Sequence, residues 1–330
     1  MLHFYFNKNL IFLIESKFFP ILSYKSQVKI TPHYSVKTAA NLSYRIYGEA
    51  ARDGDQSPIL LLHGLLGCKK HWDSIGKTMM NVTKRSVLSV DLRNHGDSPH
   101  MNSHKYEDLT ADILKLYEKL NIEKAYLVGH SMGGRASMSV SLLAPLKVAG
   151  LLIIDISPTS TARDFSEGLP TVLAAMKKVN FKKHKSIKEA KEDTRKELEN
   201  TINNELLLKA VLSNVKMKSD HTIGWACNLD ILIRHFKYIS SFPKSLRKKT
   251  YYGPTLFIGG QLSDYLPRPA VDKRDVSSCC HYVHTTDWPQ HSCRGSEDIS
   301  RTCHSFHEES RVKMISRIYQ CVNFKQINMN

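Results

Sequence analysis

Residues 129–133 read GHSMG and place Ser131 between two glycines, directly after an apolar run. A serine in this setting can occupy a sharp turn between a strand and a helix, because glycine lacks the Cβ that would clash where the backbone bends tightly. Such a turn exposes the hydroxyl at the end of a strand, where a histidine can accept its proton. The spacing therefore predicts a nucleophile elbow, with Ser131 as the nucleophile of an acyl transfer.

Two strands and a helix must position this serine. Residues 125–128 predict a short buried strand, and residues 132–143 favour a helix that begins at the turn. A second apolar strand at 58–62 ends in the glycine-bracketed loop HGLLG. Backbone N–H groups that are already aimed at a developing oxyanion stabilise it without rearrangement. We expect Leu65 and Met132 to supply these two N–H groups, while His63 is expected to bond to backbone.

A carboxylate follows a further apolar strand, over residues 148–154. The carboxyl ends of parallel strands are where open α/β sheets place their sites, so Asp155 is the first candidate for the acid that orients a catalytic histidine. Asp264, after the apolar run at 253–260, and Asp230 are the alternative acids.

Four motifs in a fixed order resemble the α/β-hydrolase superfamily, including its bacterial esterases. They are HGLLG at 63–67, DLRNHGDS at 91–98, LVGHSMGG at 127–134 and LLIIDISP at 151–158. The resemblance covers about residues 39–265. It implies an α/β fold with a mostly parallel sheet, helices on both faces and a helical lid inserted after the sixth strand. It also implies that Asp91, Arg93 and His95 form a structural turn network.

The same resemblance implies a serine hydrolase that cleaves acyl esters, such as acylglycerols, through an acyl-enzyme on Ser131 without cofactor or metal. It divides the chain into a core over 31–156 and 253–271 and a lid over 157–252. Within the lid, interspersed Lys and Glu predict a helix near 186–202. The apolar stripe over 206–236 is expected to pack on the sheet rather than line an acyl pocket.

The catalytic histidine is where the sequence departs from the family. Relatives carry a glycine–histidine pair about 25 residues beyond the position of Tyr265, followed by an amphipathic helix. Residues 272–330 instead bring several Cys and His residues with no evident strand. Their spacing is too irregular for the paired ligands that are typical of a zinc site. His291 lies closest to the expected position of the base, and His304 is the second candidate.

A shift of reading frame accounts for this tail. The codons of residues 287–290, read one base later, permit glycine followed by histidine. We interpret residues 272–330 as out of frame or disordered, with a shift near 271–274, so that the carboxyl-terminal part of the fold is incomplete. An alternative function follows: a catalytically impaired hydrolase-fold protein that acts as a binding or stabilising partner in a mitochondrial complex.

The amino terminus and the net charge bear on location and partners. Residues 1–30 alternate apolar residues with four lysines and a single acid, Glu15, which predicts a mitochondrial transit segment, with a cytoplasmic protein as the alternative. The formal net charge is +16 and is densest over residues 177–188, where we expect a solvated helix face, with an anionic membrane surface or a phosphorylated acyl carrier as alternative partners. No nucleic-acid-binding motif accompanies this charge, so nucleic acid is not expected to bind.

Overall fold

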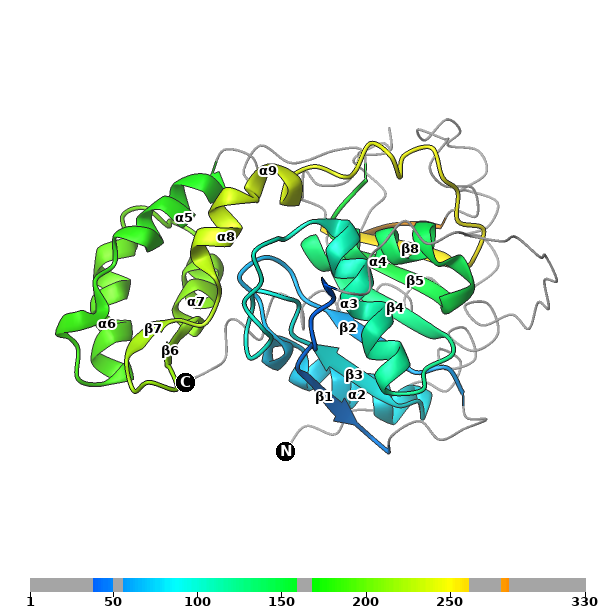
Figure 1. Ribbon diagram of the computed structural model, residues 1–330, viewed down its shortest axis with the longest axis horizontal. Helices are drawn as coiled ribbons and strands as arrows, with labels where there is room; N and C mark the ends of the chain where they lie inside the picture. The colour runs from blue at the N-terminus through cyan, green and yellow to red at the C-terminus, as the bar shows by residue number, and fades with distance from the viewer. Residues whose placement is uncertain (1–37, 50–55, 159–167, 261–279, 285–330) are drawn as a thin grey trace.

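The computed structural model describes residues 38–49, 56–158, 168–260 and 280–284 of the 330-residue chain. The expected transit segment and most of the expected tail therefore lie outside the described residues. Figure 1 shows an α/β core beside a lobe that is mostly helical, with α9 (Phe236–Ile239) linking the lobe back to the core.

The core is a seven-stranded sheet with the order β1-β3-β2-β4-β5-β8-β9. Its central strands all pair in parallel, whereas β1 and β9 pair antiparallel at the two edges. This confirms the expected mostly parallel sheet. The strands are β1 (Tyr44–Tyr47), β2 (Ile59–Leu62), β3 (Val87–Val90), β4 (Ala125–His130), β5 (Val148–Ile154), β8 (Thr255–Gly260) and β9 (Cys280–His284).

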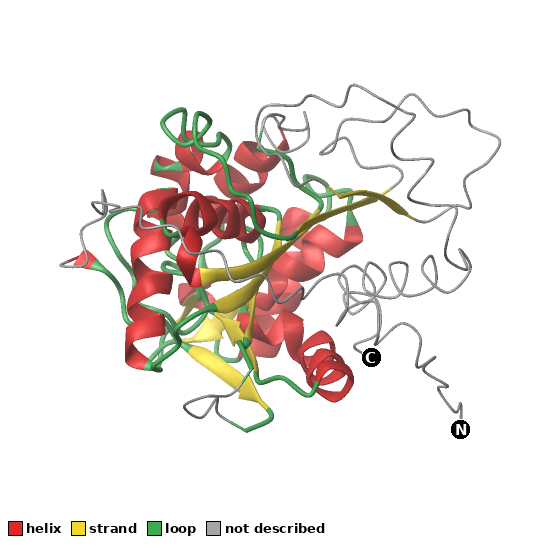
Figure 2. Cartoon of the chain, turned by 90° about the vertical axis from the view of Figure 1, so that its right-hand side faces the viewer, coloured by secondary structure: helices red, strands yellow, loops and turns green. Residues whose placement is uncertain are grey.

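Helices cover both faces of the sheet, as Figure 2 shows. Because successive side chains of a strand point to opposite faces, β2 contributes to two separate cores. Leu60 and Leu62 belong to a large cluster with residues of α3 and α4, and Leu61 belongs to a smaller one that includes Ile75 of α2. The helical segments of the core are η2 (Lys69–Trp72), α2 (Asp73–Thr83), α3 (Tyr106–Lys119), α4 (Met132–Leu143) and η3 (Pro145–Lys147).

The helical insertion leaves the sheet after β5 and returns at β8, within the expected range of 157–252. Among the described strands of the sheet it follows the fifth rather than the sixth. Its elements are α5 (Leu169–Lys178), η5 (Phe181–Lys183), α6 (Ile187–Leu198), α7 (Glu205–Ser213), β6 (Val215–Met217), β7 (Ile223–Trp225), α8 (Leu229–Arg234) and α9 (Phe236–Ile239). The antiparallel hairpin β6–β7 was not predicted.

The apolar stripe was expected to pack on the sheet, but the lid helices that carry it pack mainly on other lid elements: α7 on α6 and β6, and α8 on α5 and α9. Ser186 caps α6, and its Oγ accepts a hydrogen bond from the N–H of Glu189 at 3.2 Å, so the helix begins where expected and ends at Leu198. Leu208 and Leu232 from the apolar stripe are buried in the large core cluster. The stripe therefore stabilises the lid by packing.

One expectation about the tail was wrong. We predicted no strand beyond residue 272, but β9 pairs antiparallel with β8, from Leu256 opposite His284 to Gly260 opposite Cys280. The outer edge of β8 offers backbone groups that need partners, and the aromatic and β-branched residues Tyr282 and Val283 favour an extended backbone. Whether the tail is out of frame stays a prediction.

A buried ion pair joins the loop after β3 to α3. The Arg93 guanidinium donates to both carboxylate oxygens of Asp112 at 2.6 Å each, and both side chains are almost completely buried. Asp112 also accepts a hydrogen bond from the N–H of Ala40 at 2.6 Å. Arg93 is thus a scaffold residue, as the resemblance implied.

Replacing one member of this pair tests its structural role. Asp112→Asn leaves the Arg93 charge buried without compensation, so we expect the free energy of unfolding to fall by about 3–5 kcal/mol. Urea denaturation followed by circular dichroism measures this change. The matched control is Asp230→Asn, which removes an ion pair with Lys177 whose two side chains are 66% and 62% exposed. The control is expected to cost less than about 1 kcal/mol. Similar losses in the two variants would contradict the argument.

Candidate active site

Ser131 lies on a strained turn between β4 and α4. Its φ of 51° and ψ of −117° fall outside the regions that L-residues favour. The Ser131 N–H donates to the Ile154 carbonyl of β5 at 2.9 Å, and its own carbonyl accepts the N–H of Arg135 at 3.1 Å. The turn is thus held on one side by the neighbouring strand and on the other by the helix. The Ser131 side chain is partly exposed.

Two glycines make this turn possible. A Cβ added at Gly133 would lie 2.2 Å from the Leu62 carbonyl oxygen, and one added at Gly129 would lie 2.4 Å from the Gly133 carbonyl oxygen. Any larger residue would push α4 away from the end of β2. The spacing of Gly129 and Gly133 around Ser131 therefore reflects the close approach of the α4 backbone to the backbone of β2 and β4.

The loop after β2 passes beside Ser131. The Gly67 N–H donates to the Gly64 carbonyl at 3.0 Å and closes a tight turn in which Leu66 has a φ of 61°. A Cβ added at Gly64 would lie 3.4 Å from Ser131 Cβ. The turn that carries Leu65 is therefore a direct neighbour of the serine. Met132 begins α4, so its N–H has no acceptor within the helix.

Buried histidines hold this turn in place. His63 Nδ1 donates to the Gly64 carbonyl at 2.8 Å, while its Nε2 accepts the Leu92 N–H at 3.0 Å. His95 Nε2 accepts the Leu66 N–H at 3.2 Å. The two rings pack with centroids 5.0 Å apart. These contacts confirm that His63 bonds to backbone and that His95 belongs to a structural network.

An acidic and basic cluster supports the same loop from the side. Asp91 accepts the Lys69 N–H at 2.6 Å and the Lys69 ammonium at 2.5 Å. The ammonium also reaches Asp97 at 2.6 Å, and Asp97 pairs with Lys216 from β6 of the lid. The hydrogen bonds from Lys216 and Lys69 lower the pKa of Asp97 to about 2. Nothing in its sequence neighbourhood singles out Lys69, because a lysine after a glycine loop is usually exposed.

The lid contacts the turn directly. Asn214, which is buried between α7 and β6, donates its side-chain N–H to the Leu66 carbonyl at 2.8 Å. The backbone N–H of Asn228 donates to the Asn94 carbonyl of the core at 2.9 Å. Sequence reasoning missed Asn214, because its partner lies 148 residues earlier in the chain.

Asp155 lies at the same edge of the sheet as Ser131. His130 and Ile154 are paired residues of β4 and β5, so the residues that follow them leave the sheet side by side. Asp155 has a φ of 55°, which is close to that of Ser131, and its side chain is partly buried. The two positions predicted from the ends of separate strands are thus brought together.

The other candidates lie elsewhere. Asp230 is on α8 of the lid, and its exposed carboxylate pairs with Lys177 of α5 at 2.8 Å. Asp264, His291 and His304 lie outside the described residues. No described histidine forms a hydrogen bond with the Ser131 hydroxyl, and His63 and His95 already use both ring nitrogens.

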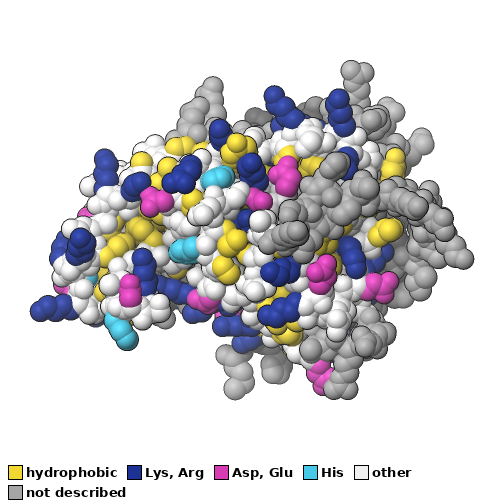
Figure 3. Space-filling model, viewed as in Figure 1, with side chains coloured by type: hydrophobic (Ala, Val, Ile, Leu, Met, Phe, Trp, Pro, Cys, Tyr) yellow, Lys and Arg dark blue, Asp and Glu magenta, His cyan; other side chains and the backbone are white. Residues whose placement is uncertain are grey.

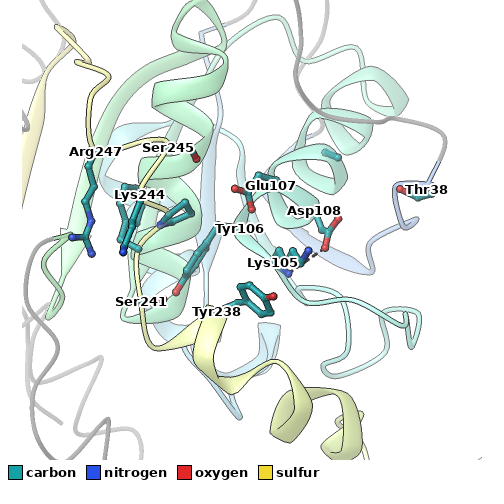
Figure 4. Close-up of a pocket in the computed structure, with 13 residues that line it drawn as sticks. Thr38, Lys105, Tyr106, Glu107, Asp108, Tyr238, Ser241, Lys244, Ser245 and Arg247 are labelled. Carbon is teal, nitrogen blue, oxygen red and sulfur yellow. Dashed lines mark hydrogen bonds between the residues drawn. The ribbon is translucent and has the colours of Figure 1, made fainter.

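A cavity of about 550 Å³ opens near the start of α3 and the segment after α9. Figure 4 shows Lys105, Tyr106 and Tyr238 among its lining side chains, and neither Ser131 nor Asp155 lines it. Across the described ranges, no three His, Cys, Asp or Glu side chains converge as metal ligands would.

The buried histidines predict how stability depends on pH. Burial lowers the pKa of His63 to about 4 and that of His104 to about 3. The unfolded chain protonates near pH 6.5, so between about pH 6.5 and 4 it binds protons that the native state does not. Stability should therefore fall as the pH is lowered through this window, by up to about 1.4 kcal/mol per pH unit for each such histidine.

Urea unfolding at several values between about pH 7.5 and 5 measures this slope. The matched variant is His104→Gln, which removes one of the titrating groups. Its slope should be shallower than that of the wild type. An identical slope in both proteins would show that this histidine does not contribute.

Comparison with known proteins places the chain in a family. Residues 57–273 match the family described as alpha/beta hydrolase fold. The sn-1-specific diacylglycerol lipase ABHD11 of Danio rerio is 32% identical over 262 residues, which cover 76% of this chain and 80% of the relative. Its Mus musculus counterpart is 35% identical over 250 residues, which cover 72% and 80%. A solved structure described as a marine microorganism esterase is 30% identical, with a TM-score of 0.62 over 69% of this chain and 84% of that one. The chain therefore belongs to the α/β-hydrolase fold family, as its motifs predicted, among relatives named as lipases and esterases.

Proposed function

We propose that this chain is a serine hydrolase of carboxylic esters with Ser131 as its nucleophile. The observation that carries the proposal is the strained backbone of Ser131, at a φ of 51°, beside the glycine turn that contains Leu65. Strain of this kind persists only where the surrounding structure holds it, and it is concentrated at functional sites. The nucleophile elbow of α/β-hydrolases has this arrangement of strand, turn and helix.

The proposed reaction runs through an acyl-enzyme. Ser131 Oγ attacks the carbonyl carbon of the ester as a histidine removes its proton, and the N–H groups of Leu65 and Met132 stabilise the oxyanion. The histidine then protonates the departing alcohol, and water, activated by the same histidine, releases the acid and restores Ser131. No cofactor or metal takes part in these steps.

Asp155 is the proposed acid that orients the histidine. It leaves the sheet beside Ser131, whereas the carboxylate of Asp230 is paired with Lys177 on the surface of the lid. Asp264 stays an alternative acid. His291 is the proposed base and His304 the alternative. Both belong to the stretch that we interpret as out of frame, so this polypeptide is proposed to have reduced activity or none.

The proposed substrates are acylglycerols or similar lipid-like esters. Relatives named as diacylglycerol lipases support this class, at 32% and 35% identity. Location in mitochondria is proposed from residues 1–30, with the cytoplasm as the alternative, and an anionic membrane surface is a proposed partner. No helix in the described parts of the chain is long and apolar enough to cross a membrane.

The second candidate function is a binding or stabilising role in a mitochondrial complex. It is favoured by one observation: the glycine–histidine pair of the family is absent from the sequence after Tyr265. Loss of one triad member lowers catalysis by several orders of magnitude while the fold stays intact.

Labelling with a fluorophosphonate probe separates the two functions. If the chain works as a serine hydrolase, the wild type labels, the Ser131→Ala variant does not, and ester hydrolysis by the variant is lower by at least about 10³-fold. The control is Ser139→Ala on the same helix, whose buried hydroxyl has no hydrogen-bond partner among the described residues. Labelling of Ser131→Ala would contradict the assignment of the nucleophile. Absence of labelling in correctly folded wild type would favour the binding role.

Asn214 tests the proposed oxyanion hole. Asn214→Ala leaves the Leu66 carbonyl buried without a donor and frees the turn from the lid, so the Leu65 N–H should lose its alignment. We expect kcat for a dissolved ester to fall about tenfold with little change in KM, because the loss affects the transition state. The control is Lys216→Ala, which breaks a different lid contact, to Asp97, and removes no hydrogen bond to the Leu66 carbonyl. Equal effects of the two substitutions would assign the loss to lid anchoring in general.

A further inference from the structure

The stretch of sequence from Ile231 in α8 through β8 is rich in cations and free of acids. Residues 231–263 contain six Lys or Arg and no Asp or Glu. In the described part of the chain, Lys237, Lys244 and Arg247 are exposed and form no ion pair with an acidic side chain. Figure 3 shows Lys and Arg side chains along the edge of the molecule over α9 and the segment that follows it. This charge is available to a partner.

The lysine-rich stretch at 177–188 is different, although the sequence singled it out. Lys177 pairs with Asp230 at 2.8 Å, and Lys183 lies 3.5 Å from Asp193. Acids on α6 and α8 therefore balance part of its charge. Exposed pairs of this kind leave less net charge for an external anion.

The cavity of about 550 Å³ lies between the residues that follow α9 and the start of α3. Cations reach it from two separate segments, with Lys105 before α3 and Lys244 and Arg247 after α9. In Figure 4, Lys244 and Arg247 lie to one side of Tyr106 and Lys105 to the other. The Ser245 hydroxyl adds a donor to the lining, whereas the Ser241 hydroxyl already donates to the Lys237 carbonyl at 2.7 Å. A phosphate group is what such a set of donors recognises best.

The carboxylates that line the cavity do not cancel these cations. Asp108 accepts hydrogen bonds from the Ser103 hydroxyl and the Lys105 backbone N–H, and it lies 3.6 Å from the buried Arg93 guanidinium. Arg93 is shared with Asp112, so it balances only part of the Asp108 charge. The lining still holds three cations, Lys105, Lys244 and Arg247, against the two acids Asp108 and Glu107.

An exposed aromatic ring adds to the surface. Tyr238 is 39% exposed, and the ammonium groups of Lys105 and Lys237 each lie 5.0 Å from its ring centroid. Tyrosine flanked by lysines is suited to the boundary between water and lipid, where the ring meets the headgroup region and the cations meet phosphates.

We propose that Lys105, Lys237, Tyr238, Lys244 and Arg247, the cationic surface, dock this protein on an anionic phospholipid membrane, with a lipid phosphate in the cavity. The surface connects to the proposed active site. Arg135, four residues after Ser131 on α4, donates to the Ser240 carbonyl at the end of α9 at 2.7 Å. Docking there would hold the lid and Ser131 close to the membrane. This catalytic benefit rests on the proposed function, but the binding does not.

Sedimentation with vesicles tests the binding, using the full chain. Wild type is expected to bind phosphatidylcholine vesicles that contain about a third phosphatidylglycerol, not phosphatidylcholine alone, and to be released by salt. Lys244→Gln with Arg247→Gln should weaken binding roughly thirtyfold, because each cation near an anionic surface contributes about a factor of five. The matched control is Lys182→Gln with Lys188→Gln, two exposed lysines of the lid that carry the same change in net charge. The control should bind within about a factor of three of wild type.

Three outcomes would overturn the proposal. The first is that wild type does not bind anionic vesicles, and the second is that the two double variants lose vesicle binding equally. The third is that calorimetry detects binding of inorganic phosphate while vesicles do not bind, which would indicate a site for a soluble phosphate compound. Activity is a separate readout. Hydrolysis of a dissolved ester should be unchanged in Lys244→Gln with Arg247→Gln, whereas hydrolysis of an ester carried in anionic vesicles should fall. An inactive wild type that still binds anionic vesicles would refute the proposed function and leave the docking surface standing.

Discussion

The close approach of Gly133 to the Leu62 carbonyl is the contact on which the candidate site depends. A Cβ at position 133 would lie 2.2 Å from that oxygen, so the first turn of α4 rests on the end of β2 only because the residue is glycine. Ser131 lies two residues before this contact, and Leu65 lies three residues after Leu62. One backbone approach therefore fixes the serine and the glycine turn relative to each other, and the bond from Ser131 N–H to Ile154 holds the strained backbone in place.

The turn after β2 is held from two sides, and each side has a different chemical requirement. From the core, His63 and His95 accept backbone N–H groups, which only neutral imidazoles can do. Burial satisfies this requirement, since it lowers the pKa of both histidines. From the lid, Asn214 donates to the Leu66 carbonyl. The lid is therefore part of the support of the turn.

Features that depend on local chain geometry could be predicted from the sequence. The glycines around Ser131 are required by a turn that involves neighbouring residues, and Asp155 follows a strand whose apolar run is easily seen. Asn214 and Lys69 could not be found in this way, because an asparagine after a helix and a lysine after a loop have many ordinary roles. Their importance comes from partners that tertiary folding brings to them. The strand at 280–284 was missed for a similar reason, since its formation depends on the open edge of β8.

The sheet also shows where a proton acceptor for Ser131 would have to enter. β8 pairs with β5 so that Ile258 lies opposite Ile154, and the chain therefore leaves β8 at the edge where Asp155 and Ser131 lie. β9 starts opposite Gly260, at that same edge. A histidine supplied by the chain beyond β8 would thus need to cross only the width of one strand to reach Asp155. Ser131, the glycine turn and the proposed acid Asp155 all lie at the ends of β2, β4 and β5, which come before the carboxyl-terminal residues in the chain. A change of reading frame after β8 would consequently remove the base while leaving the rest of the arrangement intact.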